Sequence, residues 1–287
     1  MTRTLPVLTV TLVLFVLWYA GAIVLNGPQV TSMLERSGSA WTTADFIREC
    51  WNMGRAVLPT PHQIVIDLFH SLFDYSPTNP RNILFHAYVT ASSTLVGFIV
   101  GLVVGAVLAV GIVHMRTLES SLMPWVIMSQ TVPILAIAPM LIVILGNMGF
   151  TGVVPKAMIS AYLSFFPITI GLVKGLRSID PLQLDLMRTY SATQSQVFWK
   201  LRLPASLPFL FTSLKVAVAI SLVGAIVAEL PTGAVAGLGA RLLTGSYYGQ
   251  MVQIWSTLVV AAVLSLALVW AVGAVQRATV AQSKAPS

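Results

Sequence analysis

Six apolar stretches, each about as long as a membrane span, constrain this chain more than any other feature. They are Leu5–Leu25, Phe85–Val113, Pro124–Leu145, Val154–Val173, Pro208–Ala228 and Ile254–Val275. An α-helix needs about 20 apolar residues to cross the roughly 30 Å hydrocarbon core of a bilayer. The sequence therefore predicts an all-α, polytopic membrane protein with about six transmembrane helices.

Composition excludes several other classes of protein. Hydrophobic residues make up 56% of the 287 residues and charged residues only 9%, whereas soluble domains carry about 25% charged residues. The net charge of +7 does not indicate nucleic-acid binding, because the basic residues are scattered among apolar stretches. One cysteine, Cys50, excludes an internal disulfide and a multi-cysteine metal site. The histidines lack metal-ligand spacing, and no phosphate-binding loop of the Gly-x-x-x-x-Gly-Lys-[Ser/Thr] type occurs, so we expect no enzyme activity and no bound cofactor.

Two of the stretches have a second interpretation. Lys156 and Pro167 interrupt the fourth stretch, which leaves a broken or re-entrant helix open there. The first stretch has the layout of a signal peptide, with the basic start Met1-Thr2-Arg3 and the possible cleavage site Ala20-Gly21-Ala22. Its apolar run is long for that role, and whether the helix is cleaved stays open.

Lysines and arginines predict the orientation, because they are enriched in short cytoplasmic loops. With the N-terminus in the cytoplasm, the inner segments hold Arg3, Arg116, Lys174, Arg177, Arg188, Lys200, Arg202, Arg277 and Lys284. The outer segments hold Arg36, Arg48, Arg55, Arg81 and Arg241, balanced in the long first loop by acidic residues. The sequence therefore predicts a cytoplasmic N-terminus in a multi-pass membrane protein.

The segment from Asn26 to Asn82 is predicted to lie outside the membrane. Thr60, Pro61 and Gln63 form a helix start with a capping box. Apolar residues then recur on one side, with Asp67, His70 and Ser71 on the other. The pattern predicts an amphipathic helix, either lying on the outer membrane surface or packed on the spans.

The second stretch carries small residues at four-residue spacing. They are Ser93, Gly97, Gly101, Gly105 and Ala109. Such a smooth helix face lets another backbone approach closely. The pattern predicts tight packing against a neighbouring helix, either static or sliding during gating.

A polar island, Arg177–Pro204, separates the fourth and fifth stretches, and the charge bias places it in the cytoplasm. Asp180 with Pro181, and Thr193 with Gln196, are two helix starts. We predict two short helices with a turn at Ser191-Ala192, the second ending at Leu203-Pro204 because proline disfavours helical geometry in the preceding residue. Phe198 and Trp199 are costly to leave exposed, so the island is expected to contact a partner.

The island also resembles a known motif. In Asp185-Leu186-Met187-Arg188-Thr189-Tyr190-Ser191-Ala192-Thr193, followed by Leu203-Pro204, it is similar to the cytoplasmic Glu-Ala-Ala…Gly…Leu-Pro motif of permeases of ABC importers. Asp185, Leu186, Met187 and Ser191 depart from that pattern. Leu58-Pro59-Thr60-Pro61, Val132–Pro139, Val227-Ala228-Glu229 and Gly237-Leu238-Gly239 resemble the sulfonate, taurine and nitrate branch of the family. The resemblance covers roughly residues 58–275.

This resemblance implies a function and partners. The chain would be a non-enzymatic permease of the bacterial inner membrane, working with a second identical or related permease, two ATP-binding subunits that hold ATP and Mg, and an external substrate-binding protein. The island would couple to the ATPase, and the substituted motif residues suggest a permease of a different sequence as its partner. The residues expected in this contact are Asp185, Leu186, Met187, Arg188, Ser191, Ala192, Thr193, Val197, Phe198, Leu203 and Pro204.

Domain boundaries follow from these assignments. They are 1–26 for the first transmembrane helix, 27–83 for the external loop with its amphipathic helix, 84–276 for the permease core including the coupling loop 177–204, and 277–287 for a cytoplasmic tail.

The transport path is predicted from polar residues in apolar surroundings. Gln130, Thr131, Pro133 and Glu229 are candidates, because polar groups are unfavourable against lipid; helix–helix hydrogen bonding, or for Glu229 an interfacial position, is the alternative. The branch suggests import of a sulfonate, taurine, nitrate or pyrimidine-type precursor by alternating access. A secondary transporter or channel driven by an ion gradient is the competing class, but the chain has few intramembrane acids and no detectable repeat.

Overall fold

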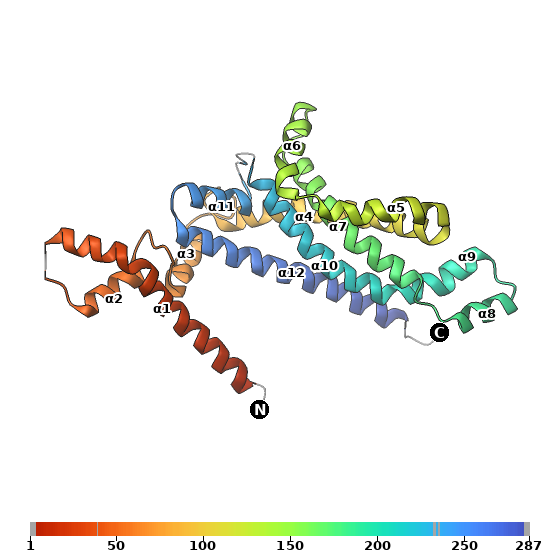
Figure 1. Ribbon diagram of the computed structural model, residues 1–287, viewed down its shortest axis with the longest axis horizontal. Coiled ribbons are helices and arrows are strands. Elements are labelled where there is room, and N and C mark those ends of the chain that lie inside the picture. Colours follow the sequence, from red (N-terminus) through yellow and green to blue (C-terminus); the bar gives the residue numbers. More distant parts are fainter. Residues whose placement is uncertain (1–3, 39, 232–233, 235, 284–287) are drawn as a thin grey trace. The chain divides into compact units, whose positions relative to one another are not determined.

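The computed structural model confirms the predicted all-α fold (Figure 1). It describes residues 4–38, 40–231, 234 and 236–283, and no strand occurs among them. The helices are α1 (Thr4–Ser37), α2 (Thr43–Asn52), α3 (Pro61–Phe73), α4 (Ile83–His114), α5 (Arg116–Met128), η1 (Ser129–Thr131), α6 (Ile134–Asn147), α7 (Val153–Leu176), α8 (Pro181–Thr189), α9 (Gln194–Val197), the π-helical turn η2 (Phe198–Arg202), α10 (Leu203–Glu229), α11 (Leu238–Tyr247) and α12 (Met251–Ser283). Arg3 and Lys284, which support the predicted orientation, lie outside the described residues, as do Met1-Thr2 and the end of the predicted tail.

The chain forms two compact units. The first comprises Met1–Ala87 with Ala240–Ala261, and the second comprises Tyr88–Gly239 with Ala262–Ser287. Two long helices, α4 and α12, contribute residues to both units. The predicted polar island belongs wholly to the second unit.

In the first unit, α1 continues well beyond the predicted span and pairs with α2, a helix that the sequence analysis did not predict. Asn26 is fully buried at this junction. Its side-chain amide donates to the carbonyl oxygens of Cys50 and Leu58, each at 3.0 Å, and its oxygen accepts from the amides of Val57 and Leu58. The buried Asn26 side chain thus has hydrogen-bond partners for both its oxygen and its nitrogen, and these bonds hold the segment that follows α2 against α1.

Helix α3 begins as predicted, with the Gln63 side chain accepting from the Thr60 amide at 3.1 Å. Two side chains of its polar side contact other helices. The Ser71 hydroxyl accepts from Arg241 of α11 at 3.0 Å, and Asp67 accepts from the Ser256 hydroxyl of α12 at 2.5 Å. The apolar side is exposed, at Val65, Ile66, Phe69 and Phe73. The interpretation of a helix packed on the spans is therefore confirmed, with Ile64, Asp67 and Ser71 turned inward and His70 exposed.

In the second unit, the stripe of small residues on α4 packs tightly against α7. A Cβ added at Gly97 would lie 2.3 Å from the Ser160 Cβ, and one at Gly101 would lie 2.1 Å from the Ser164 Oγ. Real Cβ atoms do not approach so closely, so only glycine permits this crossing. The predicted close approach of a second backbone is confirmed, and α7 is the helix that makes it.

The third and fourth apolar stretches differ from their predictions. The third was predicted as one span, but α5 and α6 meet at a bend of 100°. Val132 is extended there, with φ −78° and ψ 121°, because proline at the next position disfavours the helical region. The Tyr162 hydroxyl donates to the freed carbonyl oxygen of Ser129 at 2.5 Å. The alternative of a broken helix in the fourth stretch is wrong, since α7 runs unbroken through Lys156 and Pro167.

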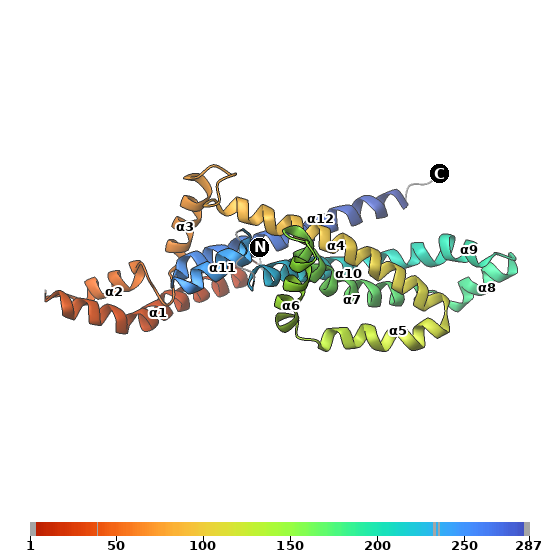
Figure 2. The ribbon, with the colours of Figure 1, turned by 90° about the horizontal axis from the view of Figure 1, so that it is seen from above.

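The described residues therefore contain five single helices long and apolar enough to cross a membrane, or up to six spans if the bent α5–α6 pair counts as one. In the second unit, α7 and α10 lie side by side, and α8 and α9 project beyond their ends in both views (Figures 1 and 2). This arrangement puts the polar island at one end of the α7–α10 pair.

Candidate functional site

The polar island contains the two capped helices that its sequence predicts. The Asp180 carboxylate accepts from the amide of Leu182 at 2.9 Å and caps α8. Thr193 caps α9 by accepting from the Gln196 amide at 3.3 Å, and the Gln196 side chain accepts from the Thr193 amide at 2.9 Å. Each cap satisfies backbone amides that have no partner inside the helix. The start of each helix is therefore fixed by hydrogen bonds between residues no more than three positions apart.

The turn between these helices lies at Ser191-Ala192, as predicted. The Ser191 amide donates to the Arg188 carbonyl at 2.8 Å, and the Ala192 amide to the Met187 carbonyl at 3.0 Å. This paired arrangement is the Schellman ending of a helix, which needs a left-handed residue and usually takes glycine. Here Ser191 adopts it, with φ 49°. The turn keeps the glycine-type geometry although the side chain is serine.

The predicted end of the second helix at Leu203-Pro204 is wrong. The chain continues from α9 through the π-helical turn η2 into α10 without a break. The Leu203 amide bonds to the carbonyl of Phe198, five residues back. A proline has no amide hydrogen and its ring collides with the carbonyl four residues earlier. The wider π turn accommodates Pro204 at the start of α10, so the fifth span begins before the predicted Pro208.

The island divides into an exposed part and an anchored part. On α8, Leu182 and Leu186 are one helical turn apart and Tyr190 follows at the same spacing; they are 76%, 56% and 76% exposed. In contrast, Val197 is buried, and Phe198 packs on the apolar cluster of α4 and α7. The exposed side of α8 is free to contact another molecule.

The remaining residues predicted for this contact fall on both parts. Asp185 and Arg188 are exposed and form an ion pair at 2.9 Å. Exposed Ser191 and Thr193 and half-buried Met187 and Ala192 lie along α8 and its turn, whereas Leu203 and Pro204 belong to the first turn of α10. Of the eleven predicted residues, four thus lie on α8, three in the turn and cap that follow it, two in α9 and η2, and two at the start of α10.

An ion pair connects the start of the island to α5. Arg177 donates to the Glu119 carboxylate at 2.8 Å. This hydrogen bond raises the pKa of Arg177 above its ordinary value. The pair is half-exposed, so it orients the two elements and adds little to stability.

A second polar site lies at the opposite end of α7 and α10. Its centre is the Glu229 carboxylate, which is fully buried. It accepts from the Thr90 hydroxyl at 2.9 and 3.0 Å, from the Lys156 ammonium at 3.1 Å and from the Gly239 amide at 2.9 Å. Lys156 also donates to the Ala236 carbonyl at 3.0 Å. We call Thr90, Lys156, Glu229 and the backbone of Ala236–Gly239 the buried charge cluster.

Two glycines allow the chain to close around the carboxylate. A Cβ at Gly237 would lie 2.2 Å from the carboxyl carbon of Glu229, and the φ of this glycine is +130°. At Gly239, a Cβ would lie 2.2 Å from the Ile226 carbonyl oxygen. Neither position has room for a side chain, which explains the two glycines in Gly237-Leu238-Gly239.

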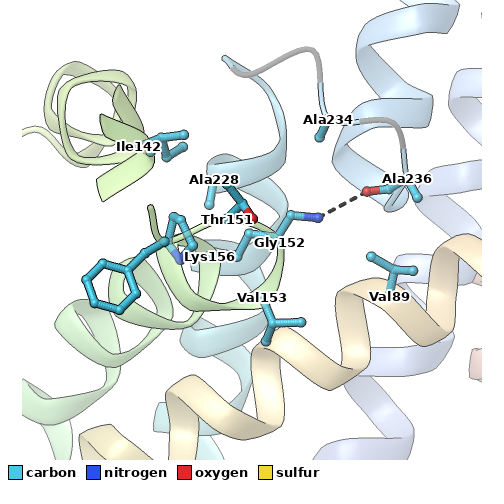
Figure 3. A pocket seen from close by; sticks show the side chains of 12 residues that line it. Val89, Ile142, Thr151, Gly152, Val153, Lys156, Ala228, Ala234 and Ala236 are labelled. Atoms are coloured by element: carbon cyan, nitrogen blue, oxygen red, sulfur yellow. Dashed lines mark hydrogen bonds between the residues drawn. The ribbon is translucent and has the colours of Figure 1, made fainter. Parts of the chain in front are cut away.

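A cavity of about 490 Å³ adjoins the cluster (Figure 3). Most of its wall is apolar, and Lys156 supplies its charged group. Figure 3 shows the lysine side chain extending between the start of α7 and Ala236. The lining residues are Val89, Ile142, Gly146, Phe150, Thr151, Gly152, Val153, Pro155, Lys156, Ala228, Ala234 and Ala236.

The four residues predicted for the transport path are not together. Gln130 and Thr131 lie in η1 and Pro133 in the following bend, and all three are exposed. Glu229 is buried in the charge cluster instead. Sequence reasoning missed its partner, Lys156. The sequence did contain a signal for this pair. Lys156 lies near the start of the fourth apolar stretch and Glu229 follows the end of the fifth. If the two helices are antiparallel, both charges lie at the same end of the helix pair.

Comparison with known proteins defines the class of this helical membrane protein. Residues 101–282 match the family described as binding-protein-dependent transport system inner membrane component, and the chain belongs to this family. A probable ABC transporter permease of Haemophilus influenzae is 28% identical over 216 residues, which are 75% of this chain and 83% of the relative. The formylaminopyrimidine transport permease ThiX of Halalkalibacterium halodurans is 33% identical over 186 residues, 64% of this chain and 68% of the relative.

Other relatives carry the names of the predicted branch. An aliphatic sulfonates transport permease of Bacillus subtilis and a nitrate import permease of Synechocystis are 26% and 25% identical, over 208 and 187 residues. These segments are 72% and 63% of this chain, and 71% and 66% of the relatives. The predicted resemblance to ABC-importer permeases of the sulfonate and nitrate type is confirmed.

Solved structures have the same fold. A chain of an amino acid ABC transporter, crystallised with histidines, superposes with a TM-score of 0.57 at 15% identity, covering 68% of this chain and 92% of that chain. A chain of the inward-facing MetNI methionine ABC transporter gives a TM-score of 0.50 at 20% identity, covering 76% and 96%. The chain is therefore a permease component of an ABC importer, with the fold of that class.

Proposed function

We propose that the polar island couples this permease to ATP-binding subunits on the cytoplasmic side of a bacterial inner membrane. The exposed apolar side of α8 carries the proposal. Leu182, Leu186 and Tyr190 lie on a helix whose ends are fixed by its own caps, and this helix projects beyond α7 and α10 (Figure 2). Exposed apolar side chains on a rigid, projecting element suit a groove in a partner protein.

The proposed complex holds two permeases, identical or related, two ATP-binding subunits and an external substrate-binding protein. ATP and Mg bind to the ATP-binding subunits, because the chain itself has no phosphate-binding loop. Closure of these subunits pushes the islands and switches the permeases between inward-facing and outward-facing states. With the N-terminus in the cytoplasm, the island faces the side on which ATP is available.

The proposed cargo is a small polar or anionic organic solute. Support comes from relatives whose names specify formylaminopyrimidine, aliphatic sulfonates and nitrate. Gln130, Thr131 and Pro133, at the exposed break between α5 and α6, are proposed to line part of the path. Unwound backbone at such a break can serve a solute path, because it must be satisfied by protein or water rather than by lipid.

A double substitution in α8 tests the coupling. Leu182→Ser with Leu186→Ser removes the apolar side while leaving the Asp180 cap and the Ser191 turn intact. We expect loss of the ATP-binding subunit on affinity purification, and loss of ATP-dependent uptake in proteoliposomes containing the whole complex. The amount of permease in the membrane should not change.

Gln183→Ser is the matched control, since it exchanges one exposed polar residue of the same helix for another. It should purify with the ATP-binding subunit as the unmodified chain does. Normal recovery and uptake with the double variant would rule out the island as the coupling element. Solute uptake by the permease alone, without ATP, would rule out the proposed energy source.

A further inference from the structure

The buried charge cluster and its cavity lie far along α7 and α10 from the polar island, and coupling makes no use of them. A buried ion pair is not needed for packing, because replacing both charges by residues of similar volume is often neutral or stabilising. The cavity volume of about 490 Å³ is within the range of about 300–1,000 Å³ that is typical of small-molecule sites. The cluster therefore has the features of a binding site.

We propose that this cavity is a subsite for a small organic anion, with Lys156 as the group that binds the anionic end. The proposal deepens the proposed import of a polar or anionic organic solute and rests on it. It narrows the cargo to molecules that join one anionic group to an apolar body.

The wall of the cavity selects for an apolar body. Val89, Ile142, Phe150 and Ala228 come from four different elements and contribute apolar surface around the space. An inorganic anion would leave these side chains without contacts, and a neutral polar solute would lose hydrogen bonds to water without replacement. A short alkyl or aryl group fills such a wall favourably.

The Lys156 ammonium has capacity for a further acceptor. It has three N–H donors, and among the described residues it donates to Glu229 and to the Ala236 carbonyl. The lysine side chain is 12% exposed, and it lines the cavity. A sulfonate or carboxylate in the cavity can accept the remaining hydrogen in a largely desolvated setting, where charge-assisted hydrogen bonds are strong.

Glu229 is suited to act as the counter-ion of this lysine when no solute is present. It keeps two other donors, the Thr90 hydroxyl, which lies within reach of both carboxylate oxygens, and the Gly239 amide. Its carboxylate can therefore release the ammonium towards a bound anion and still be satisfied. In the absence of solute, Glu229 therefore neutralises the Lys156 ammonium, which stays in place beside the apolar cavity.

Direct binding to the full chain in lipid nanodiscs tests the subsite, with radiolabelled n-butanesulfonate as the probe. No ATP-binding subunit is present, so a failure of coupling cannot affect the result. We expect saturable binding that n-butanesulfonate itself displaces and that equimolar nitrate or n-butylammonium does not. Absence of saturable binding, or equal displacement by nitrate, would overturn the proposal.

Variants then assign the binding to the lysine. Lys156→Met combined with Glu229→Gln removes both charges and should weaken butanesulfonate binding about ten- to hundredfold, the range expected for a hydrogen bond to a charged group. Glu229→Gln alone keeps the acceptor oxygen, removes the competing charge and should tighten binding. Undiminished binding by the double variant contradicts the assignment, even if the single variant fails to fold.

Lys215→Met is the control, because Lys215 is a half-buried lysine of α10 that forms no ion pair within the described part of the chain. It should bind the probe as the unmodified chain does. If it weakens binding as much as the double variant, general intramembrane charge explains the effect and the Lys156 subsite is refuted.

Discussion

The polar island and the buried charge cluster place polar groups at opposite ends of the same two helices, yet they are built differently. The hydrogen bonds that form the caps and the turn of the island join residues no more than five positions apart, such as Asp180 to Leu182, and the half-exposed Arg177–Glu119 pair is its one described long-range ion pair. Those of the cluster join Glu229 to Thr90, 139 positions away, and to Lys156, 73 positions away. The island is therefore a local structure, whereas the cluster exists only once the second unit has folded.

This difference decides what a substitution does. Charges in the island, such as the exposed Asp185–Arg188 pair, are hydrated whether or not the pair forms, and exposed pairs add little to stability. The cluster holds its charges away from water, where removing one partner leaves the other uncompensated. Changes in the island should alter contacts with a partner, and changes in the cluster should alter the fold.

The largest effect is expected from Lys156→Met. It leaves the fully buried Glu229 carboxylate without its ammonium, and breaking a buried pair in this way costs about 3–5 kcal/mol. The free energy of unfolding in mild detergent should fall by that amount, and adding Glu229→Gln should restore part of it. Arg188→Met is the matched change in the island and should leave the unfolding free energy nearly unchanged. An equal loss in both variants would remove the contrast between the two regions.

A smaller effect is expected from Gly97→Ala, where α4 crosses α7. The added Cβ would lie 2.3 Å from the Ser160 Cβ and 2.6 Å from the Ala157 carbonyl oxygen, and overpacking of this kind costs about 1–3 kcal/mol. The control is Gly146→Ala in α6, where nothing among the described residues lies within 4 Å of the new Cβ. That change should be neutral or slightly stabilising, because alanine favours helices. Thermal unfolding of the two variants measures the difference, and equal midpoints would contradict the close crossing.

The smallest effect, and the one of opposite sign, is expected from Ser191→Gly. The left-handed backbone at φ 49° costs a residue with a side chain about 1–2 kcal/mol. Glycine avoids this strain, but it loses more conformational entropy on folding, so the net stabilisation is smaller. Amide hydrogen exchange at Ala192 should slow by a few-fold, since its bond to the Met187 carbonyl becomes more stable. Ser195→Gly, inside α9, should accelerate exchange instead. Faster exchange at Ala192 in the Ser191→Gly variant would show that the left-handed conformation of Ser191 does not destabilise the turn.

Local signals made the island predictable from the sequence. The caps at Asp180 and Thr193 and the turn at Ser191-Ala192 depend on side chains and amides a few residues apart, and all three occur where predicted. The small-residue stripe of α4 was equally readable, because its spacing follows from helical geometry. The sequence could not identify α7 as its partner, since that depends on which faces meet in three dimensions.

The errors share a cause. Proline was taken as the end of a helix at Leu203-Pro204, and Pro167 with Lys156 left a broken helix open in the fourth stretch, but Pro167 lies inside α7 and Pro204 follows a π turn. Pro133, predicted to lie within a continuous span, is the proline that accompanies a break. A proline frees the carbonyl four residues earlier, which then takes another partner. At the α5–α6 break, that partner is a tyrosine more than thirty residues away, which no local pattern reveals.

The π turn that admits Pro204 has a mechanical consequence. Because it continues the helix, Gln194 and Glu229 are the two ends of one 36-residue rod, about 54 Å long at 1.5 Å per residue. The cap of α9 and the carboxylate of the charge cluster are therefore joined by one continuous helix with no loop between them. The π turn, Pro204 and Pro208 are the places where this helix can bend, because π turns and prolines are the usual causes of helix kinks. All three lie next to the island, so bending of this helix would change the direction of the island and leave the end that carries Glu229 straight.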